Sequence, residues 1–420
     1  MTKRLIKFVA FRGPFILILL VGCAATLLAS DVPRKPKVRA ITAFISIDRS
    51  TYAGQIQDTL AMLRKAKSAF EKGGYEVQTI RITTQPFPQY TRGITKAEAL
   101  EFFKKLDDLS KKESFLANVG PAMLNDQDDS AVDLLADILV TTDINTSLVI
   151  AADDGIHWNA IRAAAKTIKY VEDHSANGAR NFDFAAAAFV PPYTPFFPAS
   201  NHNGHGHQFS VGLEAGAFVA DVFTGSHGDP RMARELLSRK LAENARSLEA
   251  IALQVEKDSG WSYMGLDATP APGPDSSIGA AIQQFTGTKF GFSGTLTAAA
   301  IITDAVRSIP VKRVGYSGLM LPPLEDPVLA QGWSERNYNI DSLVAYSAVC
   351  GAGLDTIPLP GDVSQQQLER IIGDVASLAL KWHKPLAARL IPAPRKKAGE
   401  RTDFNFGIPG FPNVILQPLL

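Results

Sequence analysis

From Val38 onward, the chain alternates between short apolar segments and longer amphipathic ones, and this alternation restricts the fold more than any other feature. Residues 38–47, 75–84 and 146–152 have the apolar, β-branched character of strands. Residues 54–74 instead repeat their apolar side chains with a helical period and end at two glycines. Such alternation predicts a mostly parallel sheet covered by helices, with right-handed crossovers and with ligands at the carboxyl ends of the strands.

The second half of the chain continues the alternation with more helix. Residues 212–223 and 229–256 are predicted to be helices, and the second opens at Asp229-Pro230, a favourable cap followed by proline. Proline- and glycine-rich turns follow many of the predicted strands, as in VPPYTPFFP, ATPAPGP, LMLPPLEDP, IPLPGD and IPAPRKKAG. These turns either line a pocket or serve only to stop helices.

Composition narrows the classes of function. The 420 residues are 46% hydrophobic and 20% charged, as in a globular protein. A net charge of +1 offers no surface for polyanions, so we expect no nucleic-acid partner. The only cysteines are Cys23 and Cys350, too few for a disulfide framework. We expect one α/β domain over residues 38–420, preceded by a linker at residues 31–37.

The first 30 residues have the layout of an export signal or a short membrane anchor. A basic start, MTKRLIKFVAFR, precedes the uncharged apolar run PFILILLVGCAATLLAS. The run Leu20-Val21-Gly22-Cys23 resembles a lipobox, in which Cys23 would be acylated. The alternatives are plain cleavage near residues 24–30 and retention as an anchor. We therefore expect an exported protein, either periplasmic or attached to the membrane through this segment.

Three of the seven histidines fall within six residues of a glycine-rich stretch, FFPASNHNGHGHQFSVGLEAG (196–216). His202, His205 and His207 could bring imidazole nitrogens to a zinc or copper ion. Against a metal site, no HExxH helix or pair of carboxylates lies nearby, and a flexible loop does not preorganise its ligands. The alternatives are a polar loop at a pocket rim, with His205 as an acid or base, and a solvated loop.

Cys350 is the one thiol beyond the N-terminal segment, and Asp355 follows it closely. The thiol is either a buried, inert side chain or a nucleophile, and the second role requires a nearby base or positive charge. Asp355 is a candidate general base or metal ligand, and it could equally cap a turn.

Candidate anion-binding groups lie in two places. Arg389, Lys396 and Lys397 surround the exit of the last predicted strand and could hold a carboxylate or a phosphate. Ser276 and Ser277 open a helix whose free backbone N–H groups favour anions. The alternative for the basic group is a turn exposed to solvent, and no loop matches the phosphate-binding pattern GxxxxGK[ST].

The closing segments CGAGLDTIPLPGD (350–362) and ARLIPAPRKKAGE (388–400) resemble the closing signature of the domain-of-unknown-function family 711. The segments 265–283, 290–306 and 313–326 support the resemblance, which covers roughly residues 38–406. It implies a single large α/β barrel with its helices outside, similar to the ten-stranded barrel of the pyruvate formate-lyase-like glycyl radical enzymes. It implies no reaction, because the family is uncharacterised.

Two features depart from that family. Many relatives look cytoplasmic, whereas this chain has an export-like start, and the histidine cluster lies outside the signature. The run RVGY (313–316) faintly resembles a glycyl radical loop. However, Gly315 sits one place early and Cys350 follows it rather than preceding it, which disfavours radical chemistry.

Together these features favour an exported enzyme acting on a small anionic molecule at one barrel mouth. In this hypothesis Cys350, His205 and Asp355 serve catalysis, while the basic group and the serine pair bind the substrate. The alternative is a non-catalytic periplasmic lipoprotein that binds a small molecule or a divalent metal. A third reading is a homo-oligomer whose pocket is vestigial.

Overall fold

The computed structural model describes residues 33–273 and 275–419, so the predicted export segment and Cys23 lie outside the described residues. Residues Pro33–Leu420 cluster as one compact unit. Within the part of the chain that is described, no helix is both long enough and apolar enough to cross a membrane.

Strands and helices alternate along this unit. The strands are β1 (Lys37–Ile45), β2 (Val77–Thr84), β3 (Leu116–Val119), β4 (Thr146–Ala152), β5 (Gly155–Ile156), β6 (Phe184–Ala188), β7 (Gln208–Glu214), β8 (Ser262–Ala271), β9 (Gly353–Pro360) and β10 (Leu386–Ala393). The helices are α1 (Tyr52–Lys72), α2 (Pro88–Thr91), α3 (Lys96–Glu113), α4 (Val132–Thr141), α5 (Trp158–His174), η1 (Ala176–Asp183), α6 (Gly216–Gly225), α7 (Pro230–Ser259), α8 (Ile278–Thr286), α9 (Thr295–Arg307), α10 (Pro327–Ser334), α11 (Ile340–Ser347) and α12 (Gln365–Trp382).

The strands form two five-stranded sheets, in the orders β3-β2-β1-β7-β8 and β5-β4-β6-β10-β9. A parallel bridge between Asn118 and Asn145 connects the β3 edge of one sheet to the start of β4 in the other. At the opposite edge, Arg313 bridges to Leu266 of β8, also in parallel. The backbone a few residues farther on, at Gly318, lies against Gly351 just before β9, with no room for a side-chain carbon at either glycine.

The pairing therefore describes a barrel made of two parallel halves. Strands β1, β2, β3, β4 and β6 run in one direction, while β7, β8, the segment 313–316, β9 and β10 run in the other. The halves meet at two antiparallel seams, β1 with β7 and β6 with β10. This confirms the predicted single α/β barrel, and it adds the antiparallel seams that local sequence patterns do not reveal.

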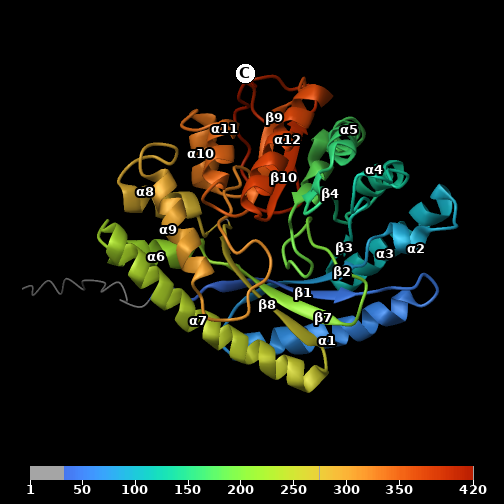
Figure 1. The fold of residues 1–420 in the computed structure, drawn as a ribbon, viewed down its shortest axis with the longest axis horizontal. Helices are drawn as coiled ribbons and strands as arrows, with labels where there is room; N and C mark the ends of the chain where they lie inside the picture. Colours follow the sequence, from blue (N-terminus) through green and yellow to red (C-terminus); the bar gives the residue numbers. More distant parts are fainter. Residues whose placement is uncertain (1–32, 274, 420) are drawn as a thin grey trace, which may run out of the picture. The chain divides into compact units, whose positions relative to one another are not determined.

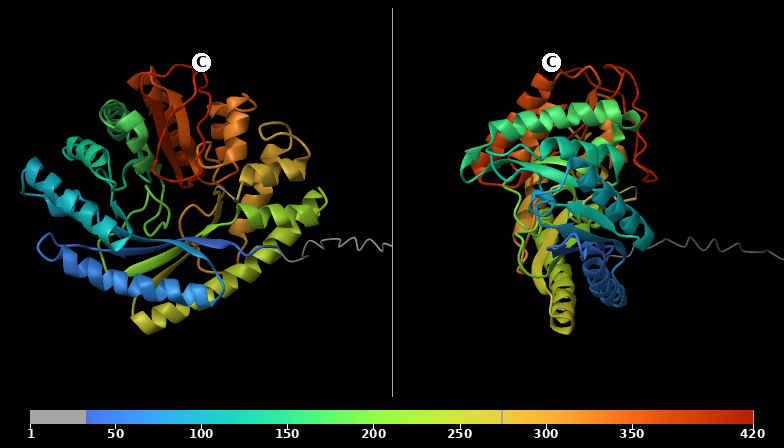
Figure 2. Two further views of the ribbon diagram at one scale, coloured as in Figure 1. Left: turned by 180° about the vertical axis from the view of Figure 1, so that it is seen from behind. Right: turned by 90° about the vertical axis from the view of Figure 1, so that its right-hand side faces the viewer.

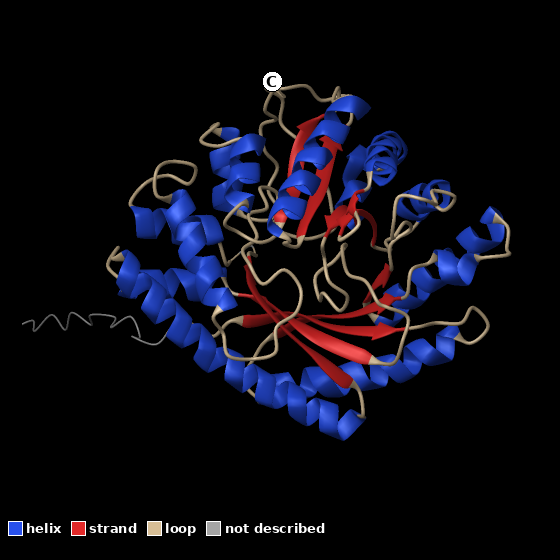
Figure 3. Cartoon of the chain, viewed as in Figure 1, coloured by secondary structure: helices blue, strands red, loops and turns tan. Residues whose placement is uncertain are grey.

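Helices cover the outside of the barrel (Figure 3). Helices α1 and α7 lie side by side across the outer face of the sheet that contains β1, β7 and β8 (Figures 1 and 2). Helix α1 presents Ile56, Leu60, Leu63 and Phe70 to the core, the face that the helical period predicts. Helix α12 packs against α5 and against strands β4, β6 and β10 of the other sheet.

One predicted element is wrong at its start. Residues 208–214 form strand β7, and helix α6 begins only at Gly216, so the predicted helix at 212–223 does not begin at 212. Phe209, Val211 and Leu213 alternate along β7 and are fully buried. Pairing with β1 on one side and β8 on the other decides the structure of this segment, overriding the local helical pattern.

The two halves define two ends of the barrel. At the loop end, β1, β2, β3, β4 and β6 finish and β7, β8, β9 and β10 begin. At the other end, which we call the tail end, β1, β2, β3, β4 and β6 begin and β7, β8, β9 and β10 finish. The histidine loop, which joins β6 to β7, lies at the loop end, whereas the turns that follow β8 and β10 lie at the tail end.

Candidate functional site

A cavity of about 730 Å³ lies inside the barrel. Its walls come from both halves of the barrel. Side chains at alternate positions of a strand face the same side, so residues two apart on one strand line the cavity together. Thr79 and Arg81 of β2 face it from the first half, and Ala387 and Arg389 of β10 face it from the second. The cavity is also lined by Arg39, Phe182, Asp183, Phe196, Phe197, Tyr316, Glu325, Asp355 and residues 405–408 near the C-terminus.

A network of buried ion pairs occupies one side of this cavity. Arg389 Nη1 donates to Asp355 Oδ1 at 2.9 Å, and Arg389 Nη2 lies 3.1 Å from Glu325 Oε1. The guanidinium carbon of Arg389 also lies 4.1 Å from the centre of the Phe182 ring. Burial opposes the charge of Arg389, but Asp355 and Glu325 outweigh it and raise the pKa. Arg389 is therefore paired and held in place.

Arg39 is paired in a similar way from strand β1. Its Nη1 lies 3.5 Å from Glu214 Oε2 and donates to Gln78 Oε1 at 3.1 Å, and its Nη2 lies 3.9 Å from Glu325. Gln78 Nε2 also donates to Glu214 at 2.8 Å. Glu325 is thus shared between two arginines, and burial raises its pKa above that of an exposed glutamate.

Arg81 differs from the other two arginines. Its side chain is 7% exposed, and its Nε donates to Thr79 Oγ1 at 3.0 Å. Among the described residues, neither of its terminal nitrogens forms a hydrogen bond or an ion pair. Burial and the nearby charge of Arg39 lower its pKa to about 9, so it still carries its charge at neutral pH. A buried, charged and unpaired guanidinium facing a cavity is costly unless something binds it.

Two of the predicted site residues lie in this cavity, Arg389 and Asp355. Lys396 and Lys397 do not line it. Lys396 follows β10 at the tail end, where its Nζ lies 3.5 Å from Asp403, and Lys397 is exposed. The structure thus places the predicted arginine and aspartate together, whereas Lys396 is half-buried beside Asp403 and Lys397 is exposed.

Ser276 and Ser277 are engaged by the protein itself. Ser276 Oγ accepts from Ala217 N at 2.8 Å, and Ser277 caps α8 by accepting from Ala280 N. The carboxylate of Asp326 then occupies the start of α8 and of α10 together, accepting from Ser277 Oγ (2.7 Å), Ile278 N (2.8 Å), Gly279 N (3.1 Å), Val328 N (2.9 Å) and Leu329 N (3.1 Å). The anion expected at this helix start is therefore an internal side chain.

Cys350 is buried and does not line the barrel cavity. Burial raises the pKa of its thiol to about 11, which keeps it protonated at neutral pH. The nearest cation, Lys384, donates instead to the backbone oxygens of Ser347, Ala348 and Cys350 at the end of α11. These features are those of a buried, protonated thiol.

The three loop histidines lie in different surroundings. His202 is 2% exposed, its Nε2 lies 3.0 Å from Gln208 Oε1, and burial lowers its pKa. His207 stacks on Trp261 with ring centres 4.9 Å apart, and His205 is exposed. Within residues 33–273 and 275–419, no group of three or more His, Cys, Asp or Glu side chains is placed to hold a metal ion. The structure does not bring His205 and Arg389 into one cavity.

Sequence reasoning missed Arg39, Arg81 and Glu325. A usable signal was present for the arginines, because each interrupts an otherwise apolar or alternating strand, VRAITAFISI and VQTIRITT. A charge inside a buried strand of a barrel is expensive and marks a site or an ion pair. Glu325 carried no such signal, since it lies in the proline-rich turn LPPLEDP.

Comparison with known proteins identifies the family of this chain. The family model described as Uncharacterised ACR (DUF711) matches residues 33–405. The chain belongs to the DUF711 family. A UPF0210 protein of Pyrobaculum islandicum is 28% identical over 400 residues, which cover 88% of each chain. A UPF0210 protein of Clostridium acetobutylicum is 25% identical over 401 residues, covering 88% of this chain and 89% of that protein.

Among solved structures, the DUF711 chain is similar to the anaerobic ribonucleotide reductase from Thermotoga maritima. The TM-score is 0.41 and the identity 9%, with 84% of this chain and 75% of that chain covered. Neither the family description nor the names of the two relatives state a reaction, so the case for a function depends on the geometry of the barrel cavity.

Proposed function

We propose that the barrel cavity binds a small molecule carrying a carboxylate or phosphate group, and that this group is held by Arg81. The observation that carries the proposal is the unpaired, buried guanidinium of Arg81. Its two terminal nitrogens offer the parallel donors that a carboxylate or phosphate accepts. The volume of about 730 Å³ falls within the usual range for small-molecule sites.

The rest of the cavity supports a small organic anion over a bare inorganic ion. Phe182, Phe196, Phe197 and Tyr316 supply an aromatic wall, and Arg81 itself lies 5.1 Å from the centre of the Phe197 ring. An apolar portion of the ligand would contact these rings while its anionic group reaches Arg81. Such a division between a few polar anchors and an apolar wall is typical of ligand sites.

The same cavity contains groups able to move protons, which favours an enzyme over a simple binding protein. Burial raises the pKa of Glu325, so its carboxyl can be protonated at a higher pH than an exposed glutamate. Asp355 is its neighbour across Arg389. In this proposal Glu325 exchanges a proton with the bound molecule, while Arg389 fixes the positions of both carboxyl groups.

The test compares ligand responses of matched arginine variants. Thermal unfolding of the wild type, Arg81→Met and Arg239→Met is measured against a panel of small mono- and dicarboxylates and inorganic phosphate. Arg239 is an exposed arginine of α7 and serves as the control. A ligand at 100 times its dissociation constant stabilises the folded state by about 2.7 kcal/mol.

We expect at least one probe to stabilise the wild type and Arg239→Met but not Arg81→Met. Without any probe, Arg81→Met should be at least as stable as the wild type, because the substitution removes an unpaired buried charge. Equal stabilisation of all three proteins, or of none, would contradict the proposal.

A further inference from the structure

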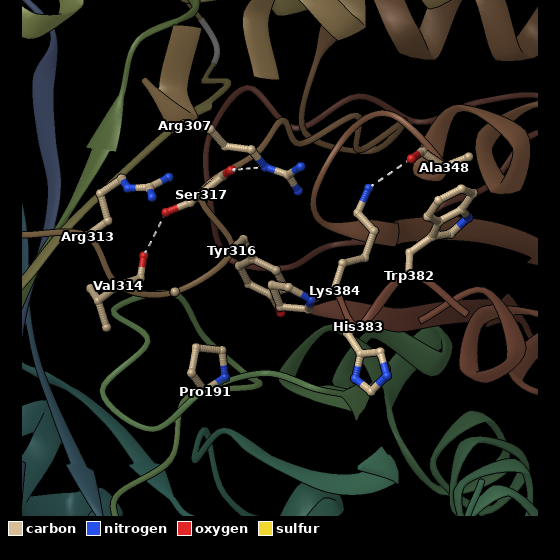
Figure 4. A pocket seen from close by; sticks show the side chains of 12 residues that line it. Pro191, Arg307, Arg313, Val314, Tyr316, Ser317, Ala348, Trp382, His383 and Lys384 are labelled. Carbon is tan, nitrogen blue, oxygen red and sulfur yellow. Dashed lines mark hydrogen bonds between the residues drawn. The ribbon is translucent and has the colours of Figure 1, made fainter. Parts of the chain in front are cut away.

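A second pocket, of about 510 Å³, lies at the loop end of the barrel. We call it the Arg307 pocket, and its lining residues are Pro191, Arg307, Arg313, Val314, Gly315, Tyr316, Ser317, Ala348, Trp382, His383, Lys384 and Pro385. Tyr316 is the one residue that it shares with the barrel cavity. Arg307 and Arg313 approach from one side, and Trp382, His383 and Lys384 face them from the other (Figure 4).

The lining of the Arg307 pocket is cationic, with no aspartate or glutamate among its residues. Arg313 forms no side-chain hydrogen bond or ion pair within the described residues, and Arg307 donates only a long bond from Nε to Ser317 O, at 3.4 Å. Both side chains therefore keep free guanidinium donors directed at a concave surface. Exposed arginines without an ion pair are common among the described residues, Arg239 of α7 being one. Arg307 and Arg313 differ from Arg239 because both line a pocket whose lining contains no carboxylate.

Lys384 adds charge to this pocket without adding donors. Its Nζ donates to three backbone oxygens at the end of α11, which uses all three protons of the ammonium group. Burial and the charge of Arg307 lower its pKa to about 8, so it is mostly charged at neutral pH. The direct contacts to a bound anion would therefore come from Arg307 and Arg313.

Trp382 gives the pocket a flat apolar wall. It is the last residue of α12 and, at 60% exposed, the most exposed large hydrophobic side chain in the described part of the chain. An indole left open to solvent beside two free guanidinium groups can stack on a planar ring while the arginines hold a phosphate. A single surface tryptophan needs no explanation, but one that lines a cationic pocket does.

We propose that the Arg307 pocket binds a phosphate ester that carries a planar ring, as a nucleoside phosphate does. Arg307 and Arg313 hold the phosphate groups, and the ring stacks on Trp382. This site is separate from the anion site at Arg81, and the two proposals can fail independently.

The experiment titrates the full-length protein with ADP at low ionic strength and follows tryptophan fluorescence. ADP should quench the emission to saturation, and Trp382→Phe should remove the quench. Inorganic pyrophosphate should compete with ADP without quenching, and adenosine alone should bind at least tenfold more weakly than ADP.

The deciding variant is Arg307→Gln/Arg313→Gln, which replaces two exposed side chains and so should leave the fold intact. It should weaken ADP binding at least tenfold, the effect of losing a charged hydrogen bond. Lys381→Gln, next to the pocket but outside its lining, should change the affinity less than twofold, and Arg81→Met should leave it unchanged. An unsaturable response, equal binding by the double variant, or equal affinity for ADP and pyrophosphate would overturn the proposal.

Discussion

The carboxylate of Asp326 caps two helices at once, and its removal should be more costly than the loss of an ordinary cap. The substitution Asp326→Ala leaves the first N–H groups of α8 and α10 without their acceptor. The site is fully buried, so water does not readily replace the lost carboxylate. Asp229→Ala is the matched control, because Asp229 caps α7 alone and is exposed.

The expected size of the effect follows from these contacts. One helix cap contributes about 1 kcal/mol, whereas each hydrogen bond to a charged group contributes about 1.5–3 kcal/mol. Asp326 accepts five such bonds at 2.7–3.1 Å, which share one carboxylate and do not add fully. We expect Asp326→Ala to lower the free energy of unfolding by about 3–5 kcal/mol and Asp229→Ala by about 1 kcal/mol.

The assay is equilibrium unfolding in urea, with and without sodium formate. Formate is the smallest carboxylate and fits the space that the alanine variant leaves. At several times its dissociation constant it should restore about 1 kcal/mol to Asp326→Ala, whereas sodium chloride of equal ionic strength should not. A loss no larger than that of Asp229→Ala, or a recovery equal in both salts, would refute the double-cap interpretation.

Three further predictions address the thiol, the close approach of Gly318 to Gly351, and pH. In a Cys23→Ser background, Cys350 should react with a thiol reagent at pH 7.5 only after unfolding, because burial raises its pKa to about 11; rapid reaction of the folded protein would contradict this. Gly318→Ala should lower the free energy of unfolding by about 1–3 kcal/mol, because the backbone of Gly351 leaves no space for a side-chain carbon. Gly225→Ala, which adds its methyl group in open space, should leave the free energy of unfolding nearly unchanged in the same urea titration. Burial raises the pKa of Asp183 to about 6, above its unfolded value of 3.8. The contribution of this carboxyl to the stability of the folded state is therefore present at acid pH and is lost as the pH rises through 6. The free energy of unfolding of Asp183→Asn, taken relative to that of the wild type, should therefore be higher at pH 7 than at pH 5. A difference independent of pH would count against the raised pKa.

The class of fold was accessible from the sequence because it depends on local periodicity. Apolar strands followed by amphipathic helices specify a helix-covered parallel sheet, and helix α7 begins at Pro230 as its Asp229 cap predicts. The antiparallel seams between β1 and β7 and between β6 and β10 depend on long-range pairing, which no local pattern encodes. The same dependence explains why the end of β7, residues 212–214, was predicted to be helical.

The candidate site was accessible only in part. Arg389 and Asp355 were identified from their charge near a strand, and they do meet in the barrel cavity. The histidine loop and the turn after β10 lie at opposite ends of the barrel, because the second half runs against the first. A prediction that treats all strand exits as one mouth cannot anticipate this reversal. Sequence also cannot show that the start of α8 is already occupied by Asp326.

The most direct test of the anion site is an experimental structure of the wild-type protein with a carboxylate or phosphate probe that stabilises it. We predict density for the anionic group inside the barrel, within hydrogen-bonding distance of both terminal nitrogens of Arg81, with Glu325 and Asp355 still against Arg389. Density for the probe only on the outer surface, or Arg81 paired with a protein carboxylate in the presence of the probe, would contradict the account.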